Sequence, residues 1–394
     1  MPLLVGTYPA AGAGAPAGRG EGVWRVDLDP ADGSLHGPRL LLATPAPSFL
    51  RHDRAAGVVH AVGEASDGTV SALRVVPGPD GAGPEGAGPD GAGPGALEHL
   101  ATVPSGGADP CHLVRVDVPG GGAALLVANY SSGSLAVLPL VADGPAAGTF
   151  ATDGPTQVLA GTGTGPRADR QEAPHAHFVA PAPGGVVLVV DLGTDRLRRL
   201  RPTARDGRVH LVDEGVAATL PPGTGPRHLA VTPDGGHLLV VGELDGRLHV
   251  LAWDAATATA SPRGVVPLLP DDVPAADPAA DGAPGAPRRP LPAHVTLHGG
   301  RALVGVRGTD APGTDRMVPV EVGAGVGGPA GAVAGTAAVL PGAWPRHHAV
   351  VGGHVVVALQ RSDRVVALPD GPGASVGPDA EVAIPAPACV VPAG

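Results

Sequence analysis

PRHLAVTPDGGHLLVVGELDGR, residues 226–247, is the stretch that decides the fold. A Pro-led apolar segment is followed by the turn Pro-Asp-Gly-Gly and then by a second apolar run that ends in a polar cluster. Pro-Asp-Gly-Gly is a strong hairpin turn signal. The stretch therefore predicts paired strands over residues 228–232 and 237–242, with a third strand over 247–253.

Weaker copies of this unit begin at Pro47, Pro110, Pro174, Pro292 and Pro345. A period of roughly 50 to 65 residues built from short strands is typical of a propeller or another closed repeat array. We expect an all-β, seven-bladed β-propeller with four-stranded antiparallel blades, formed by residues 1–394 as a single domain. Segment 387–391 has the form of a first strand and stands alone, so it should pair into the first blade and close the ring.

The 63 Gly and 47 Pro are concentrated in a few places rather than spread evenly. Three tracts at about 77–96, 271–290 and 322–335 are of low complexity. Such tracts cannot bury enough surface to offset the entropy of ordering them. We predict that they are loop insertions between outer strands.

Charge and composition exclude several function classes. The net charge is −11 with no basic stripe, which argues against nucleic acid as a partner because phosphate neutralisation dominates such binding. No apolar stretch reaches the length of about 20 residues that spans a bilayer, and the first residues lack a signal peptide pattern. We therefore expect no membrane partner and a cytoplasmic protein; the sequence carries no indication of oligomeric state.

The two cysteines, Cys111 and Cys389, lie in apolar strand-like contexts of different repeats. We expect buried free thiols rather than a disulfide, and neither has the CxxC spacing of zinc or redox sites. His112, His228 and His347 recur at one first-strand position, which predicts packing or inter-blade bonding. A metal site is not expected, because evenly spaced blades would hold these rings too far apart for zinc.

Antiparallel neighbours run in opposite directions, so the start of a blade's first strand and the end of its second strand lie at the same end of the sheet. This places many polar residues at one mouth of the channel: Asn129, Tyr130, His175, His177, Asp191, Arg227, His228, Glu243, Arg307, Arg346 and His347. Arginine binds carboxylate, phosphate or a developing oxyanion, and His and Glu transfer protons. The pattern indicates an anion-binding acid/base site.

Five strings in the middle blades resemble the lactonase family of seven-bladed propellers, which includes the propeller type of 6-phosphogluconolactonase and, more distantly, carboxymuconate cycloisomerase. They are ANYSSGS (128–134), PHAHF (174–178), VDLGTDR (190–196), GPRHLA (225–230) and GELD (242–245). The resemblance spans essentially the whole chain and implies a site in the central channel.

Carried over position by position, the resemblance implies His177, Arg227, Glu243 and Arg307 as catalytic residues. Their neighbours at the mouth, His175, Arg346 and Asn129, are expected to bind substrate. The chain departs from the family where the Asn before the Glu is Gly242, and where a Ser-Asn-Arg string reads Gly-Val-Arg at residues 305–307.

The implied function is hydrolysis of a small anionic sugar lactone, with 6-phospho-D-glucono-1,5-lactone as the leading candidate and 6-phosphogluconate of the pentose phosphate pathway, in carbohydrate metabolism, as product. Either His177 or Glu243 would be the base. No cofactor is expected, because hydrolysis of an activated ester needs positioning, a base and charge stabilisation. Two alternatives are a cycloisomerase acting on a muconate-type diacid and a non-catalytic propeller that binds proteins.

Overall fold

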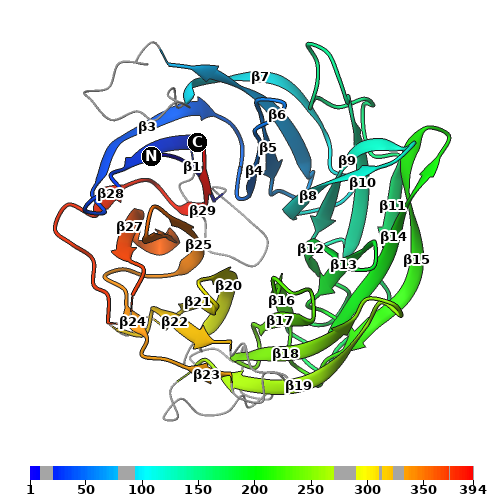
Figure 1. Ribbon diagram of the computed structural model, residues 1–394. Helices are drawn as coiled ribbons and strands as arrows, with labels where there is room; N and C mark the ends of the chain where they lie inside the picture. Colours follow the sequence, from blue (N-terminus) through cyan, green and yellow to red (C-terminus); the bar gives the residue numbers. More distant parts are fainter. Residues whose placement is uncertain are drawn as a thin grey trace.

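Seven antiparallel sheets surround a central axis in the computed structural model of this chain (Figure 1). The structure describes residues 1–8, 21–78, 94–269, 290–309, 313–322, 332–371 and 373–393. Each sheet is one blade, and its strands follow one another from the axis outward. The predicted all-β seven-bladed propeller is confirmed.

The first four blades, numbered from the N-terminus, have these strands. Blade one contains β29 (Pro387–Pro392), β1 (Pro2–Thr7), β2 (Gly22–Leu28) and β3 (Leu35–Ala43). Blade two contains β4 (Leu50–Asp53), β5 (Val58–Gly63), β6 (Thr69–Pro77) and β7 (Pro94–Pro104). Blade three contains β8 (Pro110–Val118), β9 (Gly122–Asn129), β10 (Ser134–Leu140) and β11 (Gln157–Ala160). Blade four contains β12 (Ala176–Ala182), β13 (Val186–Asp191), β14 (Arg196–Arg205) and β15 (Arg208–Thr219).

The last three blades follow the same order. Blade five contains β16 (Pro226–Val231), β17 (His237–Gly242), β18 (Arg247–Asp254) and β19 (Thr259–Pro267). Blade six contains β20 (Leu291–His298), β21 (Arg301–Arg307), β22 (Arg316–Glu321), β23 (Val333–Ala334) and, also paired with β22, β24 (Ala338–Val339). Blade seven contains β25 (Pro345–Val351), β26 (His354–Leu359), β27 (Arg364–Pro369) and β28 (Glu381–Ala383), with a 3-10 turn at Gln360–Ser362.

The C-terminal strand closes the ring, as the sequence predicts. β29 pairs antiparallel with β1, and Val5 faces Val390 in the register. Both ends of the chain therefore lie in one blade (Figure 1). Pairing β29 with β1 leaves no open junction between the first and last blades, and radial repetition of blades leaves only short, protected strand edges.

The hydrophobic core lies between the blades. Each of seven apolar clusters joins two neighbouring blades, and together they run once around the ring. Second strands such as β13 (VVLVVD) are buried along their whole length because a neighbouring blade covers each face. Continuous burial of this kind explains why these strands read as uninterrupted apolar runs rather than as alternating ones.

The strand bounds agree with the sequence at the hairpins and differ at the outer strands. The predicted strand 237–242 is β17, and the predicted strand 247–253 is β18, which extends one residue further to Asp254. The predicted insertions lie mostly outside the described residues. At their described edges the loop prediction is wrong, since residues 94–96 belong to β7 and residues 333–334 form β23.

A β-bulge interrupts the innermost strand of most blades just after its first residue. The register shifts between Pro110 and His112, Ala176 and Phe178, and Pro345 and His347, with related shifts in blades five and six. A bulge re-aims one side chain out of the regular alternation.

Cys111 and Cys389 are free and buried, as expected. No helix in the described ranges is long and apolar enough to cross a membrane.

Candidate active site

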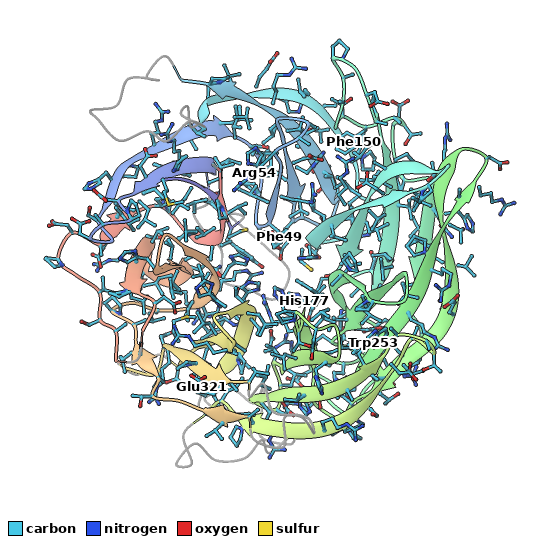
Figure 2. All side chains as sticks on the ribbon, in the orientation of Figure 1. Phe49, Arg54, Phe150, His177, Trp253 and Glu321 are labelled. Atoms are coloured by element: carbon cyan, nitrogen blue, oxygen red, sulfur yellow. The ribbon has the colours of Figure 1, made fainter. Side chains whose placement is uncertain are left out.

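Two kinds of position, which recur from blade to blade, carry the residues of the candidate site. The first is the bulge of the innermost strand, which carries His177 in blade four, Arg227 in blade five and Arg346 in blade seven. The second is the end of the second strand, where Glu243 follows β17 and Arg307 is the last residue of β21. Figure 2 shows His177 close to the axis of the ring. The four predicted catalytic residues therefore come from three adjacent blades at one end of the channel.

Glu243 is the electrostatic centre of this group and is only 3% exposed. Its Oε1 accepts a hydrogen bond from Arg170 Nη2 at 2.6 Å, and its Oε2 accepts one from Arg307 Nη2 at 2.6 Å. Arg227 Nε lies 2.9 Å from Oε2, as an ion-pair contact rather than a directed hydrogen bond. Burial by itself would raise the pKa of the carboxyl, but the guanidiniums of Arg307, Arg170 and Arg227 hold it well below its ordinary value. Glu243 is a fixed anion.

Backbone carbonyls at the start of blade six hold the far sides of two of these guanidiniums. Arg227 Nη1 donates to the carbonyl of Ala293 at 2.9 Å, and Arg307 Nε donates to that of Leu291 at 3.1 Å. Burial, together with repulsion from Arg307, lowers the pKa of Arg227 to about 9. Both guanidiniums are thus fixed between a carboxylate and a backbone carbonyl, which preorganises them.

Arg170 is a site residue that the sequence reasoning missed. It lies in the connection between β11 and β12, and its Nη2 also lies 3.4 Å from Tyr130 Oη. The next residue, Gln171, donates its side-chain amide to Asp195 Oδ1 at 2.8 Å, which anchors the loop. The signal that could have found Arg170 is its place just before the first strand of blade four, where the chain returns to the mouth.

His177 is buried, with 7% exposure, and its surroundings favour the neutral form. Burial first, and then the positive charge of Arg227, lower its pKa well below the ordinary histidine value, against an opposing contribution from Glu243. Its Nδ1 lies 3.9 Å from Cys111 Sγ, and its ring meets that of Tyr130 edge-on at 5.5 Å. A neutral imidazole is able to accept a proton.

Two of the predicted substrate-binding residues direct their side chains elsewhere. His175 stacks on the Tyr130 ring at 4.5 Å, and its ring nitrogens meet the Tyr130 carbonyl and the Glu172 carboxylate. Asn129 is fully buried, and its amide donates to Ser134 Oγ at 3.2 Å. Neither contacts the Glu243 group, and their part in substrate binding stays a prediction.

Arg346 belongs to a second group on the other side of the mouth, formed by blades seven, one and two. Its guanidinium covers the ring of Tyr8 at 4.2 Å, and its Nη2 lies 3.6 Å from Glu64 Oε1. Tyr8 and Ser48 donate their hydroxyls to the two oxygens of Glu64. Glu64 was not among the predicted site residues, although it follows β5 as Glu243 follows β17.

Deeper in the channel the first strands present a ring of histidine and phenylalanine side chains. The prediction of inter-blade bonding is confirmed for His112, whose Nδ1 accepts the N–H of Val179 at 3.3 Å, and for His347, which accepts that of Val390 at 3.4 Å. It is confirmed for His228 as well, whose Nδ1 meets Nδ1 of His294 in blade six at 2.8 Å, a ring nitrogen rather than a backbone N–H.

Neighbouring rings of this set touch one another, so the blades hold them closer than we expected from even spacing. The rings of His294 and His347 stack at 4.1 Å, and those of His112 and His228 lie 6.0 Å apart. Within the described part of the chain, no three His, Cys, Asp or Glu side chains are arranged to hold a metal ion.

The six charged side chains of the two groups around Glu243 and Glu64 have a positive excess. Four guanidiniums, of Arg170, Arg227, Arg307 and Arg346, stand against the carboxylates of Glu64 and Glu243 in ion-pair contacts. Burial removes the water that would screen these charges, which strengthens their pull on an anion. Chemically, the arrangement can bind an anionic ligand, stabilise an oxyanion and move a proton through a neutral imidazole.

Comparison with known protein families gives one match over nearly the whole chain. Residues 2–392 match the family described as "Lactonase, 7-bladed beta-propeller". Among curated proteins, the 6-phosphogluconolactonase of Bacillus subtilis is 28% identical over 309 residues, which cover 78% of this chain and 75% of that protein.

Two solved structures have the same architecture. The periplasmic gluconolactonase of Pseudomonas aeruginosa is 25% identical, with a TM-score of 0.77 and alignment over 99% of this chain and 98% of that one. A protein from Lactobacillus plantarum has a TM-score of 0.77 at 23% identity over the same shares of the two chains, and this likeness supports the fold.

Proposed function

This chain belongs to the lactonase family of seven-bladed β-propellers and is, by that membership, a lactone-hydrolysing enzyme; we propose that its substrate is a sugar lactone, with 6-phospho-D-glucono-1,5-lactone as the best candidate. The Bacillus subtilis relative carries the name of that activity, and the Pseudomonas relative is a gluconolactonase. The observation that carries the proposal is a neutral imidazole, His177, near guanidiniums that Glu243 holds in place.

We assign the base to His177. Its burial and the nearby Arg227 keep the imidazole unprotonated, because both lower its pKa. A neutral imidazole can take a proton from water as the oxygen attacks the lactone carbonyl carbon. Glu243 is unsuited to this step, because guanidiniums already bind both of its oxygens. Its role is to position the arginines.

The developing oxyanion would lie against Arg227 or Arg307. Fixed donors aimed at the place where charge develops stabilise a transition state without reorganisation. When the tetrahedral intermediate collapses, the bond between the carbonyl carbon and the ring oxygen breaks, and protonated His177 returns its proton to that ring oxygen. One water is consumed and one hydroxy acid forms, which is 6-phosphogluconate for the phosphorylated lactone, an intermediate of the pentose phosphate pathway.

The alternatives have less support. Cycloisomerisation of a muconate-type diacid would use the same arginines, but both relatives named above are lactonases. A purely protein-binding propeller does not need a buried carboxylate held by three guanidiniums. A cytoplasmic location remains a proposal, since the Pseudomonas relative is periplasmic.

The test measures hydrolysis of phosphorylated and unphosphorylated glucono-1,5-lactone by the purified chain, with the spontaneous rate subtracted. We expect catalysis of both and a higher kcat/KM for the phosphorylated lactone. A rate equal to the spontaneous one for both compounds would sink the proposed function, and a preference for the unphosphorylated compound would overturn the substrate assignment.

A further inference from the structure

The group on the opposite side of the mouth from Glu243 contains a charged side chain whose binding capacity is unused. Arg346 is only 12% exposed, yet it donates no hydrogen bond to any residue that the structure describes. Its nearest carboxylate oxygen, Oε1 of Glu64, is 3.6 Å away, which is too long for a hydrogen bond.

Two neutral donors hold the Glu64 carboxylate in place. The hydroxyl of Tyr8 donates to Oε1 at 3.0 Å, and the hydroxyl of Ser48 donates to Oε2. The face of the Arg346 guanidinium packs on the Tyr8 ring at 4.2 Å, a cation–π contact that fixes its plane. The N–H groups at its edge are therefore left for a partner that is not part of the described protein.

The other buried arginines of the mouth differ in this respect. Arg227 and Arg307 each donate to a backbone carbonyl as well as meeting Glu243. A planar guanidinium with free edges is suited to the paired oxygens of phosphate or carboxylate. None of its nitrogens is among the described side-chain nitrogens that are both buried and unpaired, so an anion that enters the mouth can reach them.

Arg346 shares one electrostatic site with the catalytic group. Its charge is among the causes that lower the pKa values of Arg227 and Arg307. It comes from blade seven, whereas His177 and Arg227 come from blades four and five. A ligand spanning the mouth can place one end at Arg346 and the other at the proposed base.

We propose that Arg346, held flat on Tyr8 beside Glu64, is the subsite that binds the phosphate of a phosphorylated sugar lactone while the lactone carbonyl lies at the Glu243 group. The hydroxyl-bound Glu64 carboxylate lines the same subsite and accepts hydrogen bonds from sugar hydroxyls. This inference rests on the proposed function for the position of the carbonyl end. The position of the anion rests on Arg346 alone.

The first test compares the ratio of kcat/KM for phosphorylated and unphosphorylated glucono-1,5-lactone in the wild type and in Arg346→Gln. Loss of charge-assisted hydrogen bonds should lower this ratio by about 10- to 100-fold. The matched control is Arg364→Gln, which removes the same charge from blade seven at an exposed pair with Glu381 and should leave the ratio unchanged. A ratio in Arg346→Gln equal to that of the wild type, which includes the case of equal losses of kcat/KM for both lactones, would overturn the subsite.

A second readout separates this subsite from the reaction. Titration calorimetry measures binding of 6-phosphogluconate and of gluconate to the wild type, to Arg346→Gln and to Arg346→Lys, which covers a failure of the Gln variant to fold. We expect 6-phosphogluconate to bind more tightly than gluconate in the wild type, to lose that advantage in Arg346→Gln, and to keep only part of it in Arg346→Lys, whose ammonium lacks the paired N–H edge. Wild-type protein that binds the two acids equally would contradict the subsite even if lactone hydrolysis were demonstrated. Conversely, phosphate-dependent binding that needs Arg346 would support it even if no lactone were hydrolysed.

Discussion

Mild acid should unfold this protein because it buries neutral histidines. Besides the half-buried His52, seven histidines have pKa values lowered chiefly by burial: His60, His112, His177, His228, His294, His347 and His348. The pKa is about 4 for His60 and about 3 for His112. In the unfolded chain the same rings take up protons near pH 6.5. Below that pH the unfolded state binds more protons than the native state, so stability falls as the pH falls.

The magnitude follows from this difference in proton binding. Between pH 7.0 and 5.5 each ring that stays neutral in the native state and titrates in the unfolded state costs about 1.2 kcal/mol. Seven such rings cost about 8 to 9 kcal/mol, which is comparable with the whole free energy of unfolding of a typical domain, about 5–15 kcal/mol. Glu243 does not offset this loss, because its pKa is held below its ordinary value and it titrates at lower pH.

The assay is urea unfolding followed by far-UV circular dichroism at pH 7.0 and 5.5 and at fixed ionic strength. In His112→Phe the loss should be smaller by about 1.2 kcal/mol, and Phe178 already occupies the equivalent position of blade four. His99→Gln, at an exposed residue, should reproduce the full wild-type loss. A wild-type difference below about 2 kcal/mol between the two pH values would refute this reasoning.

Two further substitutions test how the site is held together. Glu243→Gln leaves buried guanidiniums without their counter-ion. We therefore expect a loss of about 3–5 kcal/mol in the free energy of unfolding and little remaining turnover. A free energy of unfolding equal to that of the wild type would show that these ion pairs contribute nothing to stability. Asp195 accepts N–H groups from Gly223 and Gly225 and the amide of Gln171, so Asp195→Ala should loosen the loops before Arg227 and after Arg170 and lower kcat/KM by at least about tenfold. A kcat/KM equal to that of Asp234→Ala, a turn substitution in the hairpin between β16 and β17, would contradict that role.

The fold was predictable because the physical signal repeats. Six of the seven blades place an almost wholly buried second strand after a Gly-containing turn, so an apolar run and a turn recur in the sequence however much the polar residues vary. The closing strand, β29, was predictable for the same reason, since residues 387–391 had the form of a first strand without a blade. The ends of β7, β14 and β23 were not, because outer strands are partly exposed and tolerate Gly, Pro and charged residues.

The candidate site was predictable only where it lies on repeated positions. His177, Arg227, Glu243 and Arg307 occupy the bulge and the second-strand end of their blades, so aligning the repeats finds them. Arg170 lies on a connection that no other blade shares, and only the folded chain brings it to Glu243.

Glu64 occupies a repeated position, but no short sequence motif around it indicated a site residue. Its partners Tyr8 and Arg346 come from blades one and seven. For a similar reason, the sequence left Glu243 as a possible base, whereas we now assign it the positioning of the arginines. A sequence places a carboxylate near a base, but it does not show that guanidiniums hold both of its oxygens.

Hydrolysis of a sugar lactone with His177 as the base is the proposal on which the roles of the other site residues depend. The most direct test is kcat/KM for 6-phospho-D-glucono-1,5-lactone, with the spontaneous rate subtracted, in the wild type, in His177→Gln and in the control His237→Gln, at the far end of β17. We expect a rate well above the spontaneous one for the wild type and the control, and a loss of about 10²- to 10⁴-fold in His177→Gln. Wild-type activity in His177→Gln would contradict it.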